Sequence, residues 1–132
     1  MHLQESGEMY LETILILSRQ GHVRSIDISE YMNYSKPSVS RAVRILRTGG
    51  YIEIDGGGLI TLTEAGREIA EKIYERHTVL SKVLMMLGVS PEVATEDACR
   101  MEHTISDESF EALKRHVRTR MEQQTKDPDD KA

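Results

Sequence analysis

The sequence predicts a mostly α-helical protein, in which three helices and a short β-hairpin are followed by further helices. In most segments the apolar residues recur with the period of a helix, as Tyr10, Ile14 and Leu17 do. Between residues 51 and 62 the period changes, because two short apolar segments surround three glycines at 56–58. A glycine turn between two such segments is typical of a β-hairpin.

Three helices are expected before the hairpin, each bounded by a capping residue or a glycine. They are expected over about twelve residues from Glu8, over Ile26–Met32, and from Ser35 to Gly49. Ser25 is the expected N-cap of the second helix. Pro37 suits the first turn of the third helix, since a backbone N–H would be unpaired there in any case.

Three more helices are expected after the hairpin, and each begins at a capping residue. The caps are Thr63, Ser90 and Ser106. The first of these helices is long and reaches about Met86, and the second is expected to carry the whole segment 99–103. Residues 124–132 are polar and are expected to form a disordered tail.

Composition excludes several classes of protein. A length of 132 residues suits one domain or two small lobes. The single cysteine, Cys99, excludes a framework of intramolecular disulfides, and no run approaches eighteen apolar residues. We therefore expect a cytoplasmic protein with no membrane partner. The net charge of −5, taken alone, argues against nucleic acid as a partner, because phosphate binding needs Lys and Arg.

The charge is nevertheless unevenly distributed. Residues 33–50 contain four basic residues and no acidic one, a local charge of +4. A short helix, a turn, a basic helix and a hairpin follow one another as in a winged helix-turn-helix, whose basic helix enters the major groove of double-stranded DNA. The residues expected to contact DNA lie on this helix and at the hairpin tip: Ser35, Lys36, Pro37, Ser38, Ser40, Arg41, Arg44, Arg47 and Gly57.

Plainer interpretations of both features stay open. A basic helix face is often only a solvated surface. The glycines at 56–58 suit any tight turn, because glycine adopts positive φ without strain. They lack the Lys and Ser/Thr that follow the glycines of a P-loop, which argues against a nucleotide site.

A second group of residues suggests a metal site. Cys99, Glu102 and His103 have the spacing i, i+3, i+4, which brings three side chains to one face of a helix. Thiolate, carboxylate and imidazole together suit a divalent transition metal such as Fe(II), Zn(II) or Co(II). One helix cannot complete a coordination sphere, so further ligands are expected among Met9, Glu12 and His77. Taken singly, each of these residues also has an ordinary structural explanation.

Two rival functions are compatible with parts of this pattern. A metalloenzyme would use an open coordination position on the metal, but the sequence lacks His-Glu-x-x-His and any second catalytic group of residues. A winged-helix regulator that does not sense metal would need only the basic helix. We therefore predict a protein that is not an enzyme.

Five segments carry a resemblance to a known family. They are Glu8–Glu12 (EMYLE), Ser35–Ser40 (SKPSVS), Leu62–Gly66 (LTEAG), Glu75–His77 (ERH) and Asp97–Ser106 (DACRMEHTIS). In this order and spacing the chain resembles the diphtheria toxin repressor family of metal-dependent transcriptional repressors, from residue 8 to about residue 120.

The resemblance implies a homodimer that binds a palindromic operator of metal-homeostasis genes. It also implies a winged helix-turn-helix DNA-binding domain at 1–64 and a helical dimerisation and metal-binding domain at 65–123. The SH3-like domain of the iron-responsive branch has no counterpart in this sequence.

The resemblance assigns metal ligands residue by residue. Met9, Cys99, Glu102 and His103 match the main metal site of the iron-responsive branch. His77 matches a ligand position of both branches, and Glu12 matches one of the manganese-responsive branch. Two departures from the iron branch are Ser81, where that branch has an acidic residue, and Thr95, where it has a histidine.

Ligand softness favours one metal. The thioether of Met9 and the thiolate of Cys99 favour Fe(II) over Mn(II), which prefers oxygen ligands. Mn(II), Co(II) and Zn(II) remain alternatives. The alternative function is a Mn(II)-responsive repressor of the same family.

Overall fold

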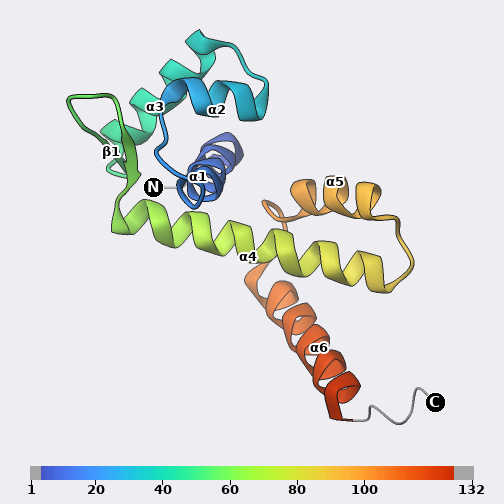
Figure 1. The fold of residues 1–132 in the computed structure, drawn as a ribbon. Coiled ribbons are helices and arrows are strands. Elements are labelled where there is room, and N and C mark those ends of the chain that lie inside the picture. Colours follow the sequence, from blue (N-terminus) through green and yellow to red (C-terminus); the bar gives the residue numbers. More distant parts are fainter. Residues whose placement is uncertain (1–3, 127–132) are drawn as a thin grey trace. The chain divides into compact units, whose positions relative to one another are not determined.

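The computed structural model describes residues 4–126 and consists of helices with one small sheet in this part of the chain (Figure 1). The elements follow the order α1 (Glu5–Ser18), α2 (Ser25–Met32), α3 (Lys36–Thr48), β1 (Ile52–Ile54), β2 (Ile60–Leu62), α4 (Glu64–Met86), α5 (Pro91–Met101) and α6 (Asp107–Lys126). This order confirms the predicted mostly α fold class. Within the described part, no helix is both long and apolar enough to cross a membrane.

The chain divides into two compact units that meet within α4, between Tyr74 and Glu75. The N-terminal unit therefore contains the first half of α4 in addition to α1, α2, α3 and the hairpin. The C-terminal unit contains the second half of α4 together with α5 and α6. The domain boundary expected from the sequence, at residue 64, lies ten residues earlier, at the start of α4.

The N-terminal unit has a continuous apolar core. Leu11 and Ile14 of α1 are fully buried there with Ile28 of α2. The helix α3 contributes the three apolar residues that its periodicity predicted, Val39, Val43 and Leu46. Burial of this stripe leaves the opposite, basic side of α3 facing water.

The helix caps agree with the sequence in most places. Ser35 caps α3 as predicted, because its Oγ accepts the N–H of Ser38 at 3.3 Å. The prediction for α2 is wrong by one residue, since Arg24 rather than Ser25 occupies the N-cap position. The cause is Asp27, whose carboxylate accepts the backbone N–H of Arg24 at 2.8 Å and so fixes the start of the helix.

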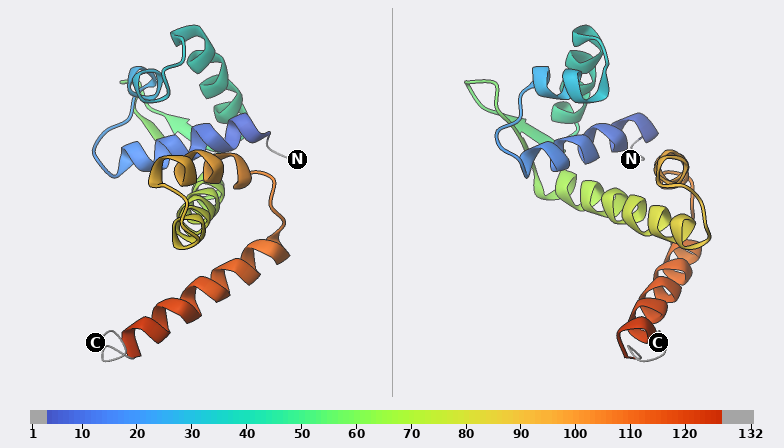
Figure 2. Two further views of the ribbon diagram at one scale, coloured as in Figure 1. Left: turned by 90° about the vertical axis from the view of Figure 1, so that its right-hand side faces the viewer. Right: turned by 45° about the vertical axis from the view of Figure 1, so that its right-hand side comes forward.

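β1 and β2 form the predicted antiparallel hairpin, with Ile52 opposite Leu62 and Ile54 opposite Ile60. Residues 55–59 connect them and form the wing, which projects from the strands as a loop (Figure 2, right). The Asp55 carboxylate accepts the backbone N–H groups of Gly57 and Leu59 at 2.8 and 2.9 Å. Both N–H groups hold the pKa of Asp55 below its usual value, that of Leu59 most strongly.

The C-terminal unit departs from the prediction at the end of α5. The helix ends at Met101, so it does not carry the whole segment 99–103. Glu102 is its C-cap residue and still donates its N–H to the carbonyl of Ala98, whereas His103 lies in the turn that follows. The side chain of Arg76 donates to the carbonyl of Glu102, which would accept the N–H of Ser106 if the helix continued.

The helix α6 begins as predicted, with Ser106 Oγ accepting the N–H of Ser109 at 3.1 Å. It continues to Lys126, so residues 124–126 are helical where the tail was expected to begin. The rest of the expected disordered tail, residues 127–132, lies outside the described residues.

Gly66 in the first turn of α4 provides a test of the packing between this helix and the hairpin. A Cβ atom at this position would lie 2.0 Å from the carbonyl oxygen of Tyr51. Helix propensity alone predicts that Gly66→Ala stabilises the protein by about 1 kcal/mol. We expect the opposite, a loss of about 1–3 kcal/mol in the free energy of unfolding, because the backbone at Tyr51 or at the start of α4 must move to make room for the Cβ atom. Urea unfolding followed by circular dichroism measures the sign.

The matched control is Gly56→Ala in the wing. A Cβ at Gly56 would meet no heavy atom within 4 Å. Its free energy of unfolding should stay within about 0.5 kcal/mol of the wild-type value. A stabilised Gly66→Ala variant would contradict the packing described for α4.

Candidate metal centre and nucleic-acid interface

The centre of the candidate metal site is the carboxylate of Glu102, which is 0% exposed. One of its oxygens, Oε2, lies 2.9 Å from Nδ1 of His77 on α4. The other, Oε1, lies 3.3 Å from Nε2 of His103, whose side chain is 1% exposed. A single buried carboxylate thus lies between two imidazole rings, all three within the C-terminal unit.

A buried carboxylate such as that of Glu102 requires polar or charged partners. Transfer of an ionised carboxylate from water into an apolar interior is very unfavourable unless it is paired or binds a metal. Imidazole nitrogen and carboxylate oxygen are also common ligands of divalent transition metals. The donor set of Glu102, His77 and His103 therefore fits a metal of this class.

Cys99 lies on α5 one turn before Glu102, and its side chain is half-buried. Its spacing to Glu102 is preserved because α5 stays helical up to its C-cap residue. The structure thus brings Cys99, Glu102, His103 and His77 into the same unit.

The other two predicted ligands, Met9 and Glu12, lie on α1 in the N-terminal unit. Met9 is half-buried, and its backbone carbonyl accepts the hydroxyl of Thr13 at 2.9 Å. Glu12 is among the buried residues of α1. The one-turn spacing on α1 puts Met9 and Glu12 on a common side of the helix.

Neither residue that replaces a ligand of the iron branch resembles a metal ligand here. Ser81 is buried on α4, one turn after His77. Thr95 is exposed on α5, and its hydroxyl donates to the carbonyl of Pro91 at 2.7 Å. Both are weak ligands for transition metals.

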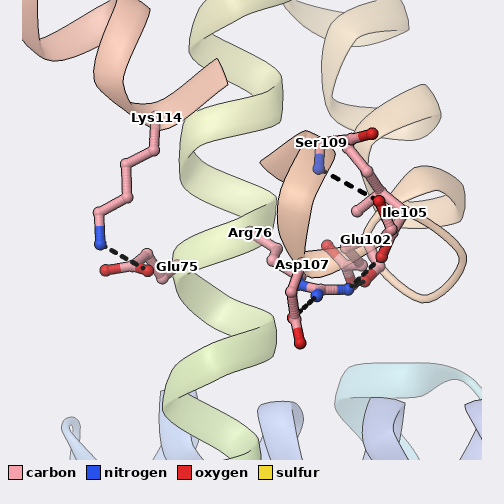
Figure 3. Close-up of polar contacts among 8 residues, drawn as sticks. Glu75, Arg76, Glu102, Ile105, Asp107, Ser109 and Lys114 are labelled. Atoms are coloured by element: carbon pink, nitrogen blue, oxygen red, sulfur yellow. Dashed lines mark hydrogen bonds and ion pairs between the residues drawn. The ribbon is translucent and has the colours of Figure 1, made fainter. Parts of the chain in front are cut away.

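Arg76 contacts the segment 99–103 and was not among the residues predicted from the sequence. Arg76 is 6% exposed and donates to the backbone carbonyl of Glu102 at 3.1 Å (Figure 3). A signal for it was present, since Arg76 follows Ile69 and Ile73 at the spacing of the buried stripe of α4. A charged residue at a stripe position predicts a buried cation with polar partners.

The predicted DNA-contacting residues are exposed along α3 and its start, except Ser38, which is half-buried. Lys36, Ser40, Arg44 and Arg47 form a basic strip on the solvent side of α3. At the N-terminus of this helix, Ser38 Oγ accepts from the hydroxyl of Ser35 at 2.8 Å and from Nη2 of Arg41 at 3.4 Å. These bonds orient the first turn of α3.

The wing is held in place by a second residue that sequence analysis missed. The guanidinium of Arg24, at the start of α2, donates from Nη1 to the carbonyl oxygen of Gly57. Gly57 is exposed and its N–H is bonded to Asp55. The wing tip is therefore a fixed turn beside the helix-turn-helix.

Comparison with known proteins identifies both units. Residues 2–57 match the family described as iron dependent repressor, N-terminal DNA binding domain. Residues 63–131 match the iron dependent repressor, metal binding and dimerisation domain.

Several relatives are similar over most of the chain. The transcriptional regulator MntR of Escherichia coli O157:H7 is 36% identical over 114 residues, which cover 86% of this chain and 74% of MntR. The iron-dependent repressor IdeR of Mycobacterium tuberculosis is 32% identical over 108 residues, which cover 80% of this chain and 47% of IdeR.

A solved structure of the manganese regulator SloR superposes with a TM-score of 0.76 at 30% identity, over 89% of this chain and 55% of SloR. The chain thus spans about half the length of IdeR and of SloR. Taken together, the two family matches and the winged helix-turn-helix fold show that the chain belongs to the iron-dependent (diphtheria toxin) repressor family, whose members are metal-dependent transcriptional repressors and not enzymes.

Proposed function

We propose that this chain is a metal-activated repressor that responds to Fe(II) and binds, as a homodimer, a palindromic operator of metal-homeostasis genes. The observation that carries this proposal is the buried carboxylate of Glu102 between the imidazoles of His77 and His103. In a family of metal-dependent repressors, such a donor set is best explained as the core of the metal site.

The proposed ligand set extends beyond these three residues. The set also includes Cys99 of α5 and, as the resemblance to the family implies, Met9 and Glu12 of α1. When bound, the metal would supply a cross-link between these side chains and a positive charge to balance Glu102.

Sulfur ligands support Fe(II) as the metal. A thioether at Met9 and a thiolate at Cys99 are softer than the oxygen ligands that Mn(II) prefers. The alternative, a Mn(II)-responsive repressor, is favoured by the similarity to the regulator MntR and by the carboxylate of Glu12. Co(II) and Zn(II) suit the same ligands and serve as probes.

A homodimer would place two copies of α3 in successive major grooves, about 34 Å apart. Support for a dimer comes from apolar residues at the connection between α4 and α5, where Met85, Met86 and Leu87 are 42%, 42% and 76% exposed. Clustered exposed apolar side chains of this kind are typical of an interface. Metal binding would then favour the dimer geometry in which both copies of the basic strip contact DNA.

The first test is metal-activated DNA binding. Anaerobic fluorescence anisotropy with labelled promoter DNA, at fixed salt, should show that Fe(II) raises DNA affinity roughly 5- to 150-fold, the range of a 1–3 kcal/mol coupling. Glu102→Gln and His103→Ala should lose this activation. Glu102→Gln should remain folded, because a neutral amide of the same size is easier to bury than a carboxylate.

Circular dichroism supplies the control for folding of both variants. Metal-activated binding by a folded Glu102→Gln variant would contradict the site. If DNA binding by the wild type does not change with Fe(II), Mn(II), Zn(II) or Co(II), the result would favour a winged-helix regulator that does not sense metal.

The second test concerns the identity of the metal. The double variant Cys99→Glu with Met9→Asp replaces both sulfur ligands by carboxylates, so the metal ranking should move toward Mn(II). The same anisotropy titration with Fe(II), Mn(II), Zn(II) and Co(II) measures the ranking. An unchanged ranking would remove the two sulfur atoms from the ligand set.

The third test concerns the basic strip. Arg44→Ala should weaken operator binding about 5- to 150-fold, because a contact from arginine to a base contributes ~1–3 kcal/mol. Metal affinity, measured by anaerobic titration, should not change. Arg67→Ala is the matched control, since Arg67 is an exposed arginine of α4 that pairs with Glu71. If both variants weaken operator binding equally, Arg44 contributes only its positive charge and makes no specific contact with DNA.

A further inference from the structure

Arg76 on α4 is the only arginine found buried among the described residues, at 6% exposure. Its guanidinium donates from Nη1 to two backbone carbonyls, those of Glu102 at 3.1 Å and Ile105 at 2.8 Å. From Nη2 it pairs with the carboxylate of Asp107 (Figure 3). Its central carbon also lies 5.5 Å from the ring centre of Phe110, within cation–π range.

The three polar partners of Arg76 lie in or next to the segment that joins α5 to α6. This segment, residues 102–106, is here called the ligand turn. Glu102 is the C-cap of α5, and Asp107 is the first residue of α6. A helix C-terminus leaves carbonyl oxygens without N–H partners. One guanidinium therefore supplies donors to the turn and ties its two ends together.

The same turn carries the two buried side chains of the candidate metal site, Glu102 and His103. Glu102 is thus held twice from α4. Arg76 holds its backbone carbonyl, and His77, the next residue, contacts its carboxylate at 2.9 Å. Consecutive residues of one helix fix both the backbone and the side chain of the same residue.

We propose that Arg76 is the positioning residue of the metal site, which holds the ligand turn in its metal-binding conformation before metal binds. The inference rests on the proposed function of Glu102 and His103 as ligands. Arg76 itself is not a ligand, because a guanidinium is always protonated and has no free electron pair to donate.

A role limited to stabilising the fold explains Arg76 less well. Apolar residues of similar size at buried ion-pair positions are often as stable or more so, because a buried charge must be desolvated. Ile73 and Leu80 occupy the neighbouring positions of the same buried stripe of α4. What an apolar residue at position 76 lacks is a set of donors for the carbonyls of the ligand turn.

Lysine is a poor substitute for this role. Three acceptors, two carbonyls and one carboxylate, are contacted by the planar fork of a single arginine. The ammonium of lysine is a compact point charge on a flexible stem and cannot span both ends of the turn. Arg76→Lys therefore keeps the positive charge but cannot contact all three acceptors at once.

The chain offers a matched control on the preceding residue. Glu75 pairs with Lys114 of α6 at 3.1 Å, so this pair also joins α4 to α6 (Figure 3). In that view it lies on the other side of α4 from Arg76 and away from the ligand turn. Lys114→Met removes an interaction between the same two helices without touching residues 102–107.

The experiment compares the full-length wild type with Arg76→Lys and Lys114→Met under anaerobic conditions. Three quantities are measured: Co(II) affinity and the Co(II) d–d absorption spectrum by titration, amide hydrogen exchange at Thr104 and Ile105 in metal-free protein, and urea unfolding. Arg76→Lys should lower Co(II) affinity tenfold or more, change the d–d spectrum and speed exchange at both amides. Lys114→Met should change Co(II) affinity by less than twofold and leave the spectrum unaltered.

Wild-type Co(II) affinity and spectrum in folded Arg76→Lys would overturn the proposal. So would losses of affinity that simply follow the loss of stability in both variants, because the role would then be structural. If Arg76→Lys does not fold, Asp107→Asn carries the test, since Asp107 is 74% exposed and its variant removes the negative charge that pairs with Nη2. It should weaken Co(II) binding two- to fivefold, and unchanged binding would count against the proposal.

Failure of the proposed function gives a different result. In that case the wild type does not bind Co(II), or Glu102→Gln binds it equally well, and the inference about Arg76 falls with it. Loss of binding in Glu102→Gln but not in Arg76→Lys would leave the metal site intact and reject only the positioning role.

Discussion

Burial of the Glu102 carboxylate is the constraint that shapes the C-terminal unit. A fully buried carboxylate is tolerable only when its surroundings supply positive charge or hydrogen-bond donors. His77 reaches it from α4 and His103 from the turn after α5, so helix packing and side-chain chemistry are fixed together. Removal of either imidazole would leave the buried carboxyl group with fewer polar neighbours, so the unit cannot be described as apolar packing alone.

The helix α4 provides Arg76 and His77, which contact the backbone and the buried carboxylate of Glu102. It is continuous over 23 residues, from the contact of Gly66 with Tyr51 beside the hairpin to the segment that carries Arg76 and His77. This one helix therefore contributes both to the unit that holds α3 and to the unit that holds the buried carboxylate.

Local signals predicted most of the fold. Caps at Ser35 and Thr63 and the glycines after α3 mark element ends through contacts within a few residues, and the structure contains them. The end of α5 could not be predicted in this way. The carbonyl of its C-cap residue Glu102 accepts from Arg76, which is 26 residues distant in sequence. The ligand candidates could be named from spacing and chemistry, and the stripe of α4 marks Arg76 as buried, but the contacts of Arg76 with the ligand turn required the structure.

The uneven distribution of charge along the chain affects how it would bind DNA. The basic strip on α3 belongs to a segment of charge +4 in a chain of net charge −5, so the remainder of the chain carries a net charge of −9. Non-specific affinity for DNA grows with the number of phosphates that a protein neutralises, and net negative charge on the same chain opposes it. In the homodimer proposed above, tight operator binding would then come from two correctly spaced copies of α3 acting together rather than from general attraction. An acidic chain whose proposed DNA contacts are concentrated on one helix and its flanks is for this reason well suited to control by a ligand that alters spacing, because loss of the spacing would leave little residual attraction to hold it on DNA.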